Sequence, residues 1–456
     1  MKKILFIVLI ISYDRVCSQE IPAFKPLRYD EDYTFLKSDS GTHWYNKIKF
    51  SPLSNSRQAY IGFGGETRFQ YFYTKNEGWG GVAKDDDGYI LSRYLLHADF
   101  HASKYFRTFI QLQSSVSGSR IDASPVDENP LELQQAFIDI NSNPLNKSKI
   151  TLRIGRQELL YGSQRLVSVR DGPNSRQSFD AVKSMLNSDN YKVDLFYSHY
   201  VRSHNGIFDD GFNKNTKFWG AYIVRNKVPV LKNIDLYYFG LWKRNAIFND
   251  GAGKELRHSV GSRMWGKIKN WQYDAEALYQ FGEFAIKNIS AWTASLNASY
   301  KFNNSKLKPE LGLKAELISG DRQTGDDKLQ TFNSLFPRGA YFGLAALIGP
   351  ANLIDIHPSL SLALSQKLNI DIDYDIFWRY SRNDGVYAVN TSLIYSDANS
   401  SKNHIGRQLA GSFIYRPANF LYFRTEITWF DAGDYLKIAG AGRDIIFTAV
   451  TGQLKL

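Results

Sequence analysis

The chain has 456 residues, a formal net charge of +11 and an ordinary hydrophobic content of 43%. That length exceeds an ordinary single soluble core and suits one large β-barrel. Aromatic residues reach 15%, a surplus that the aromatic girdles of a membrane barrel would use. Beyond the N-terminus no apolar run approaches the ~18 residues of a spanning helix, which excludes a helical membrane protein. A soluble all-β protein such as a propeller stays open as the alternative.

The first residues have the pattern of a secretory signal. Two lysines precede the apolar run Ile4–Ile11, and the small-residue rule places cleavage before Gln19, so residues 1–18 are predicted to be a signal peptide. A lipoprotein is the competing interpretation of Cys17, but the residues before it are a poor context for lipidation. Cleavage would remove this only cysteine together with three positive charges and one negative charge. The mature chain would then have no thiol chemistry and a net charge of +9.

Residues 19–56 lack alternation and are interpreted as a periplasmic lead-in, followed by a barrel over residues 57–456. From Ala59 onward, segments of about 9–16 residues alternate between apolar and polar side chains, and turn residues separate them. Such lengths suit strands that cross a bilayer at a tilt.

The clearest strand spans residues 369–382. One of its faces carries isoleucines and aromatic residues, and the other carries charges, among them Asp371, Asp373 and Asp375. Lipid outside a barrel and water inside would produce this pattern. Segments 310–318 and 421–430 repeat it.

Eighteen strands are predicted, an even number as expected of a single-chain bacterial barrel. Their starts fall near residues 59, 88, 105, 131, 149, 178, 190, 215, 232, 256, 270, 289, 308, 356, 369, 403, 419 and 440.

The connections alternate in length. Tight turns follow even-numbered strands, as at 187–190, 269–270 and 417–419, and longer loops follow odd-numbered strands, as at 75–88, 118–130, 160–177 and 383–402. With both termini in the periplasm, the short turns are periplasmic and the long loops extracellular. The sequence therefore predicts an all-β fold, a closed antiparallel transmembrane barrel in a bacterial outer membrane. Whether residues 318–357 plug or gate this barrel stays open.

Basic residues gather between Thr151 and Met185. Arginine presents a planar fork of donors that grips carboxylates, and a basic ring at a constriction selects anions. The candidate contacts for an anionic solute are Arg153, Arg156, Arg165, Arg170, Arg176 and Lys183. The alternative is that these residues pair with acids of the lumen.

Strand alternation assigns two of these arginines to a face. Arg153 should point into the lumen because Leu152 and Ile154 take the opposite face. A bulge at Gly155 would turn Arg156 inward as well.

Other clusters carry weaker signals. His97, Asp99 and His101 share a strand face and could bind a metal, and the acidic runs 85–87 and 209–210 suit calcium, but a wet lumen and solvated loops explain both. No supported Ser-His-Asp set, phosphate loop or zinc spacing is found. We therefore assign no catalytic residue, no metal, no cofactor and no nucleic-acid partner.

Several segments resemble the alginate export family of outer-membrane proteins. They are LRYDEDYTFL, WYNKIKFSPL, YIGFGGETRF, RIGRQELLYGSQRLVSVRDGPNSRQSFDAVK and SGDRQTGDDKLQTFNSLFPRGAYFG, of which TFNSLFPRGAYF is the most specific. The resemblance implies a monomeric barrel of about eighteen strands in outer-membrane lipid. It also implies an electropositive constriction that passes an acidic, uronate-type, alginate-like oligosaccharide or polysaccharide, with the six basic residues above as pore contacts.

The leading hypothesis is passive diffusion of such anionic solutes through an arginine-lined pore, without a reaction. A general nonselective porin is the first alternative, with the arginines only balancing lumen acids. A surface adhesin that binds through its long loops is another. An outer-membrane hydrolase is the last, for which Ser198, His199, Ser203 and His204 lie close in sequence.

Overall fold

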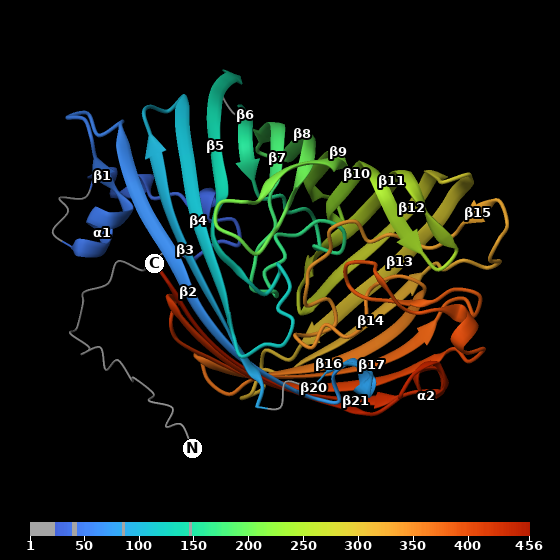
Figure 1. The fold of residues 1–456 in the computed structure, drawn as a ribbon. Coiled ribbons are helices and arrows are strands. Elements are labelled where there is room, and N and C mark those ends of the chain that lie inside the picture. Colours follow the sequence, from blue (N-terminus) through green and yellow to red (C-terminus); the bar gives the residue numbers. More distant parts are fainter. Residues whose placement is uncertain (1–22, 39–42, 84–86, 146–147) are drawn as a thin grey trace.

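The computed structural model describes residues 23–38, 43–83, 87–145 and 148–456, and these form a ring of antiparallel strands (Figure 1). The predicted signal peptide lies outside the described residues. Of the described strands, twenty share one sheet, in which two are two-residue additions and eighteen build the wall. The last strand closes on the first, from Glu66 opposite Lys455 to Lys75 opposite Ile446. The predicted closed barrel of eighteen strands is confirmed.

The wall strands lie close to the predicted positions. They are β2 (Tyr60–Lys75), β3 (Tyr89–His101), β4 (Phe106–Gly118), β5 (Asn129–Leu145), β6 (Ser148–Gln157), β7 (Phe179–Ser188), β8 (Tyr191–Arg202), β9 (Gly211–Val228), β10 (Lys232–Phe248), β11 (Gly251–Ile268), β12 (Trp271–Phe284), β13 (Lys287–Lys301), β14 (Glu310–Ile318), β16 (Leu353–Ala363), β17 (Leu368–Arg379), β20 (His404–Ala418), β21 (Leu421–Ala432) and β22 (Ile445–Lys455).

Several short elements lie outside the eighteen wall strands. They are the strands β1 (Ser51–Pro52), β15 (Lys328–Leu329), β18 (Val386–Tyr387) and β19 (Leu393–Tyr395), the helices α1 (Trp44–Lys49) and α2 (Asp434–Ala439), and 3-10 turns at Arg28–Asp30, Thr34–Ser38, Glu77–Gly80 and Asp397–Asn399. None of the helices in the described part of the chain is long and apolar enough to cross a membrane.

Side-chain alternation explains why these segments form a wall. In β21, Phe423, Ile427 and Trp429 are exposed on the outer face, whereas Glu426 and Thr428 are buried on the inner face. An apolar outer face suits lipid and a polar inner face suits a lumen. The three aspartates of β17 lie on its inner face, as predicted.

The alternation of connection lengths is also observed. Turns of two to four residues follow β3, β7, β11 and β20, whereas the long loops include 158–178 (loop A), 319–352 (loop B) and 380–403 (loop C). The exceptions are the two-residue turns 249–250 and 285–286, which lie at the same end as the long loops. The first of these turns joins β10 and β11, strands of 17 and 18 residues.

The lead-in enters the end of the barrel where β2 begins, the end predicted to be periplasmic. Arg28 donates to the carbonyl oxygens of Gly65 at 3.0 Å and Leu456 at 2.7 Å, next to the closing seam. Arg176 of loop A donates to the carbonyl oxygen of Pro26 at 2.8 Å. The lead-in therefore links the seam of the barrel to a loop inside it.

One aromatic residue anchors the lead-in in the lumen. The ring of Tyr29 is edge-on to those of Phe109 and Phe137, with centroids 5.8 and 5.2 Å away, and the guanidinium carbon of Arg153 lies 4.1 Å from its centroid. The Tyr29 hydroxyl donates to the carbonyl oxygen of Glu158 at 2.9 Å. A buried aromatic ring with a satisfied hydroxyl holds strongly, and a cation over its face adds to this.

We predict that Tyr29→Ala detaches the lead-in while the barrel stays folded. Loss of a buried aromatic side chain costs about 3 kcal/mol, which should raise cleavage of the lead-in by added protease more than tenfold. Phe35→Ala is the matched control, because Phe35 lies in the same segment but is 47% exposed. Equal cleavage rates for the two variants would show that Tyr29 is not the anchor.

Candidate functional site: two loops inside the barrel

Loops A and B pair with each other inside the ring of strands. The amide of Phe336 donates to the carbonyl of Leu166 at 2.8 Å, and the amide of Ser168 donates to the carbonyl of Phe336 at 2.9 Å. The amide of Arg338 donates to the carbonyl of Gln164 at 3.1 Å. These three bonds pair loop B side by side with loop A, and the two paired loops are called the loop body below.

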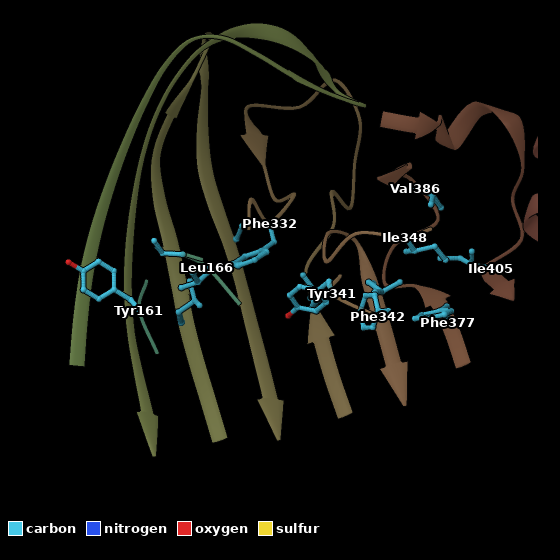
Figure 2. Packing of buried hydrophobic residues seen from close by; sticks show 14 of the residues in the cluster. Tyr161, Leu166, Phe332, Tyr341, Phe342, Ile348, Phe377, Val386 and Ile405 are labelled. Atoms are coloured by element: carbon cyan, nitrogen blue, oxygen red, sulfur yellow. The ribbon is translucent and has the colours of Figure 1, made fainter. Parts of the chain in front are cut away.

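A hydrophobic cluster joins this body to the wall. Figure 2 shows side chains of loops A and B packed against the inner wall, with Tyr161 and Leu166 from loop A, Phe332, Tyr341, Phe342 and Ile348 from loop B, and Phe377 and Ile405 from the wall. Burial of apolar side chains on this scale holds the two loops in one position against the wall. The central part of loop B thus lies in the lumen, packed against the inner wall.

A glycine lets the two loops approach each other. A Cβ atom on Gly339 would lie 2.2 Å from Cδ of Pro173 and 3.4 Å from Cγ of Arg170. The first distance is far inside van der Waals contact, so a side chain at this position would push loop A away. The glycine at position 339 of loop B is therefore explained by close packing.

Loop A is fastened to the wall by Asp171. Its Oδ1 atom accepts from Arg93 at 2.7 Å and from Arg176 at 3.1 Å, and its carbonyl oxygen accepts from Arg68 at 2.6 Å. Desolvation in the lumen opposes ionisation of this carboxyl, but Arg93 and then Arg176 outweigh it and hold the pKa of Asp171 well below its usual range. Asp171 therefore stays charged.

Arg165 fastens the other end of loop A and ties it to loop B. It contacts Glu316 and the hydroxyl of Tyr341 at 2.9 Å, Thr293 at 3.0 Å and Glu276 at 3.5 Å. Three wall strands and both loops meet at this one guanidinium, whose rigid fork suits several acceptors at once.

Three of the predicted contacts serve in ion pairs of the wall. Arg153 binds Asp139 through two bonds of 2.7 and 2.8 Å, and Lys183 lies 3.2 Å from Asp194. Arg153 points inward, as predicted. Arg156 donates to Asp180 at 3.0 Å.

The expected inward turn of Arg156 is wrong. Gly155 has a φ of +130°, but the register from Arg153 to Gln157 runs unbroken opposite β7. Without a bulge the alternation continues, so Arg156 lies on the face of Ile154, opposite to Arg153.

Arg176 and Arg165 are also paired, as described above, and the structure thus brings five of the six predicted residues to carboxylates. Arg170 differs. Its Nη1 atom donates to the Tyr200 hydroxyl at 3.4 Å, while Nε and Nη2 are buried and have no hydrogen-bond partner in the described part of the chain. Its φ of +54° is a conformation that costs free energy and depends on the surrounding contacts.

Arg338 was not among the predicted residues, although it lies within the most specific motif of the sequence. Its side chain is exposed, and its Nη2 atom donates only to the carbonyl oxygen of Tyr341, at 3.1 Å, among the bonds described. The adjoining Gly339 packs on Arg170, so the two arginines come from touching segments. The signal in the sequence that could have identified Arg338 is its position in that motif.

The other sequence clusters have structural roles. Asp99 pairs with Arg107 at 2.6 Å and His101 at 3.1 Å, and the buried His97 stacks on Phe109. These residues form no metal-binding group within the described chain.

The proposed hydrolase residues are also engaged elsewhere. Ser198 donates to the carbonyl oxygen of Phe218 at 2.7 Å, and the ring of His199 contacts Phe212. Asp209 and Asp210 gather with His204, and positions 84–86 lie outside the described residues.

A closed barrel of eighteen strands with an apolar outer face and loops folded into the lumen defines an outer-membrane channel of a bacterial cell. The family model for alginate export matches residues 59–444. The chain therefore belongs to the alginate export family. No match to a curated protein was found.

Solved structures with this fold include three porins of similar size. Pseudomonas aeruginosa OccD3 (OpdP) aligns at a TM-score of 0.58 and 10% identity over 90% of this chain and 93% of its own. A BenF-like porin from Pseudomonas fluorescens Pf-5 gives 0.56 and 9%, over 87% and 98%. Pseudomonas aeruginosa OccK2 (OpdF) in complex with glucuronate gives 0.53 and 10%, over 87% and 96%. At such identities the likeness establishes the fold.

We predict that Gly339→Ala separates loops A and B. The added methyl group overpacks the contact with Pro173 at a cost of about 1–3 kcal/mol, so single-channel conductance should rise and its fluctuations increase. Gly411→Ala is the control, because a Cβ atom there meets nothing within 4 Å. The control should behave like the wild type, and an unchanged conductance in Gly339→Ala would contradict this account of the contact.

A buried aspartate, Asp321, lies at the outer end of loop B. The amide of Asp321 donates to Asp384 at 2.8 Å, and that of Gly325 donates to Asp250 at 2.8 Å. Burial, followed by the carboxyl of Asp250, raises the pKa of Asp321 to about 7. A detached loop would give this carboxyl its ordinary pKa of ~3.9.

We therefore predict that loop B is held most firmly in acid. The stabilisation is complete below about pH 4 and is lost as the pH rises through about 7, because the attached loop binds the proton more tightly. Current fluctuations should become more frequent between about pH 4 and pH 7, by at most about tenfold per pH unit. Asp321→Asn should remove this dependence, whereas Asp327→Asn, at an exposed position of the same loop, should keep it.

Proposed function

We propose that this protein is a channel through which anionic solutes, chiefly acidic sugars of the uronate type, diffuse passively. The observation that carries the proposal is the contrast among the arginines of the lumen. Most of them are neutralised by carboxylates, whereas Arg170 and Arg338 lie on touching loops and have no carboxylate partner among the ion pairs of the described residues. An unpaired guanidinium is the group that a passing carboxylate can bind.

The position of these two arginines supports the same function. They belong to the loop body that occupies the lumen, so a solute has to pass beside them. Fixed cations in a narrow, weakly screened passage attract anions and replace part of their lost hydration. The glucuronate complex of OccK2 supports an acidic sugar as the solute class, because a protein of similar fold holds one. The family assignment points to alginate, a longer chain of such sugars.

A cavity at the predicted periplasmic end supplies room for an acidic sugar. Its volume is about 500 Å³, and its lining contains six basic side chains, Lys37, Arg57, Lys104, Arg107, Lys149 and Arg153, against four acidic ones, Asp30, Glu31, Asp32 and Asp139. That volume lies within the ~300–1,000 Å³ of sites for small molecules. In the proposed function this cavity is the vestibule that concentrates anions before the loop body.

A general nonselective porin is the second candidate, and one observation favours it. Ion pairs such as Arg153–Asp139 and Arg263–Asp274 balance the charge along much of the lumen. In that function Arg170 and Arg338 would be too few to bias the flux.

Ion selectivity separates the two candidates. Reversal potentials across a planar bilayer under a salt gradient should give a preference for anions, and an oligouronate should reduce the current. The double variant Arg170→Gln with Arg338→Gln should bring the permeability ratio close to one and weaken block by the oligouronate about tenfold for each arginine lost. Gln keeps polar bulk, so the change reports on charge.

Arg407→Gln is the matched control, because it removes an exposed arginine that alternates with the inward Gln408 on β20. It should leave the ratio and the block unchanged. An unselective wild-type channel would favour the general porin, and an unchanged ratio in the double variant would remove both arginines from the proposed site.

A further inference from the structure

A group of metal-binding side chains lies on the inner wall where β16 and β17 pair. Asp355 and His357 come from β16 and Asp375 comes from β17, and their potential ligand atoms lie within 4.8 Å of one another. Nδ1 of His357 is 2.7 Å from a carboxylate oxygen of Asp375. This group is distinct from the six basic residues considered above.

The carboxylates of this group lack the donors that buried acids need. Asp355 is 0% exposed, and neither of its oxygens has a hydrogen-bond partner among the described residues. Asp375 is 1% exposed, and although Gln408 donates to its Oδ2 atom at 3.0 Å, its Oδ1 atom has no such donor. Two buried carboxylates side by side, with three of their four oxygens lacking a donor, repel each other and are costly, so a positive species between them would stabilise the pair.

The neighbouring side chains offer a positive group to Asp375, through the imidazole of His357, but none to Asp355. The neighbouring ammonium of Lys314 on β14 lies 2.8 Å from Glu316, which leaves Asp355 outside its ion pair. The imidazole of His357 lies between two carboxylates, with Nε2 3.0 Å from Asp373 and Nδ1 2.7 Å from Asp375. When Nε2 donates to Asp373, Nδ1 presents its lone pair to the pocket, as in carboxylate–histidine–metal triads.

The ligand set defines the class of cation. Two carboxylates and one imidazole suit first-row transition metals such as Zn²⁺, whereas Ca²⁺ and Mg²⁺ prefer oxygen ligands alone. Three protein ligands leave at least one coordination position open, as in sites that bind a further ligand. Asp373, at 38% exposed, marks the side that faces the lumen.

The two other acidic groups of the described chain are less suited. Asp210 accepts bonds from Asn129 and from the amide of His204, so its carboxylate is already satisfied. Asp250 pairs with Lys287, which fills the position of a cation there. These groups therefore serve as controls.

We propose that Asp355, His357 and Asp375 bind one divalent transition-metal ion of the Zn²⁺ class, with Asp373 positioning the imidazole. Gln408 links this site to loop B, because the same Nε2 atom that contacts Asp375 donates to the carbonyl oxygen of Phe342 at 2.6 Å. A bound ion therefore fixes the wall at the point where loop B is attached.

The test is direct binding of Zn²⁺ and Co²⁺ to the full mature barrel in detergent after chelator treatment. The expected result is one ion per chain by elemental analysis, with a visible Co²⁺ spectrum of low coordination number. His357→Gln and Asp355→Asn should abolish binding at this site, and Asp373→Asn should weaken it about 10–100-fold. His204→Ala and Asp326→Asn should leave the binding unchanged. Heat-dependent migration in gels checks that each variant is folded.

Absence of uptake by the wild-type barrel would overturn the proposal and would leave a proton as the species shared by the carboxylates. Binding that survives in His357→Gln but is lost in His204→Ala would overturn it as well and move the ion to the extracellular loop. Because binding is measured without flux, these outcomes are independent of the selectivity measurement.

Discussion

The carboxylate of Asp171, held between Arg93 and Arg176, is the contact on which the interior of this barrel depends. Arg93 belongs to the wall and Arg176 to the far end of loop A, so the carboxylate fixes both the position and the curvature of that loop. Loop B takes its place by pairing with loop A, and the lead-in is bound through Arg176. One charged centre thus sets the arrangement of three segments that are distant in sequence.

Ion pairing also determines the electrostatic potential along the passage. An arginine paired with a carboxylate presents a dipole, whose field falls off quickly, whereas an unpaired arginine presents a full charge. The lumen contains many arginines of the first kind and few of the second. The net positive charge of the chain therefore says little about its selectivity, which depends on where the unpaired groups lie. In the proposed function, stability and selectivity are assigned to different arginines of one loop body.

The wall could be predicted from the sequence, because each strand records lipid on one face and water on the other within its own residues. Glu310–Ile318 has the bounds that its alternation gave, and the inward direction of Arg153 followed from Leu152 and Ile154. Arg156 was misplaced because a glycine permits a bulge without requiring one. The partners inside the barrel left no local pattern, since Arg93 and Asp171 are separated by 78 positions. For the same reason the sequence showed a basic cluster but not which member lacks a partner.

One side of the barrel opening is built differently from the other, because β10 and β11 are long and only a two-residue turn joins them. A strand of 17 or 18 residues is longer than the ~9–11 that a bilayer requires, so this sector continues beyond the membrane as stiff sheet. Loops B and C, on the neighbouring sector, instead bend over the opening. A solute at this opening thus meets sheet on one side and loops on the other, so that strand pairing fixes the shape of only one side of the mouth.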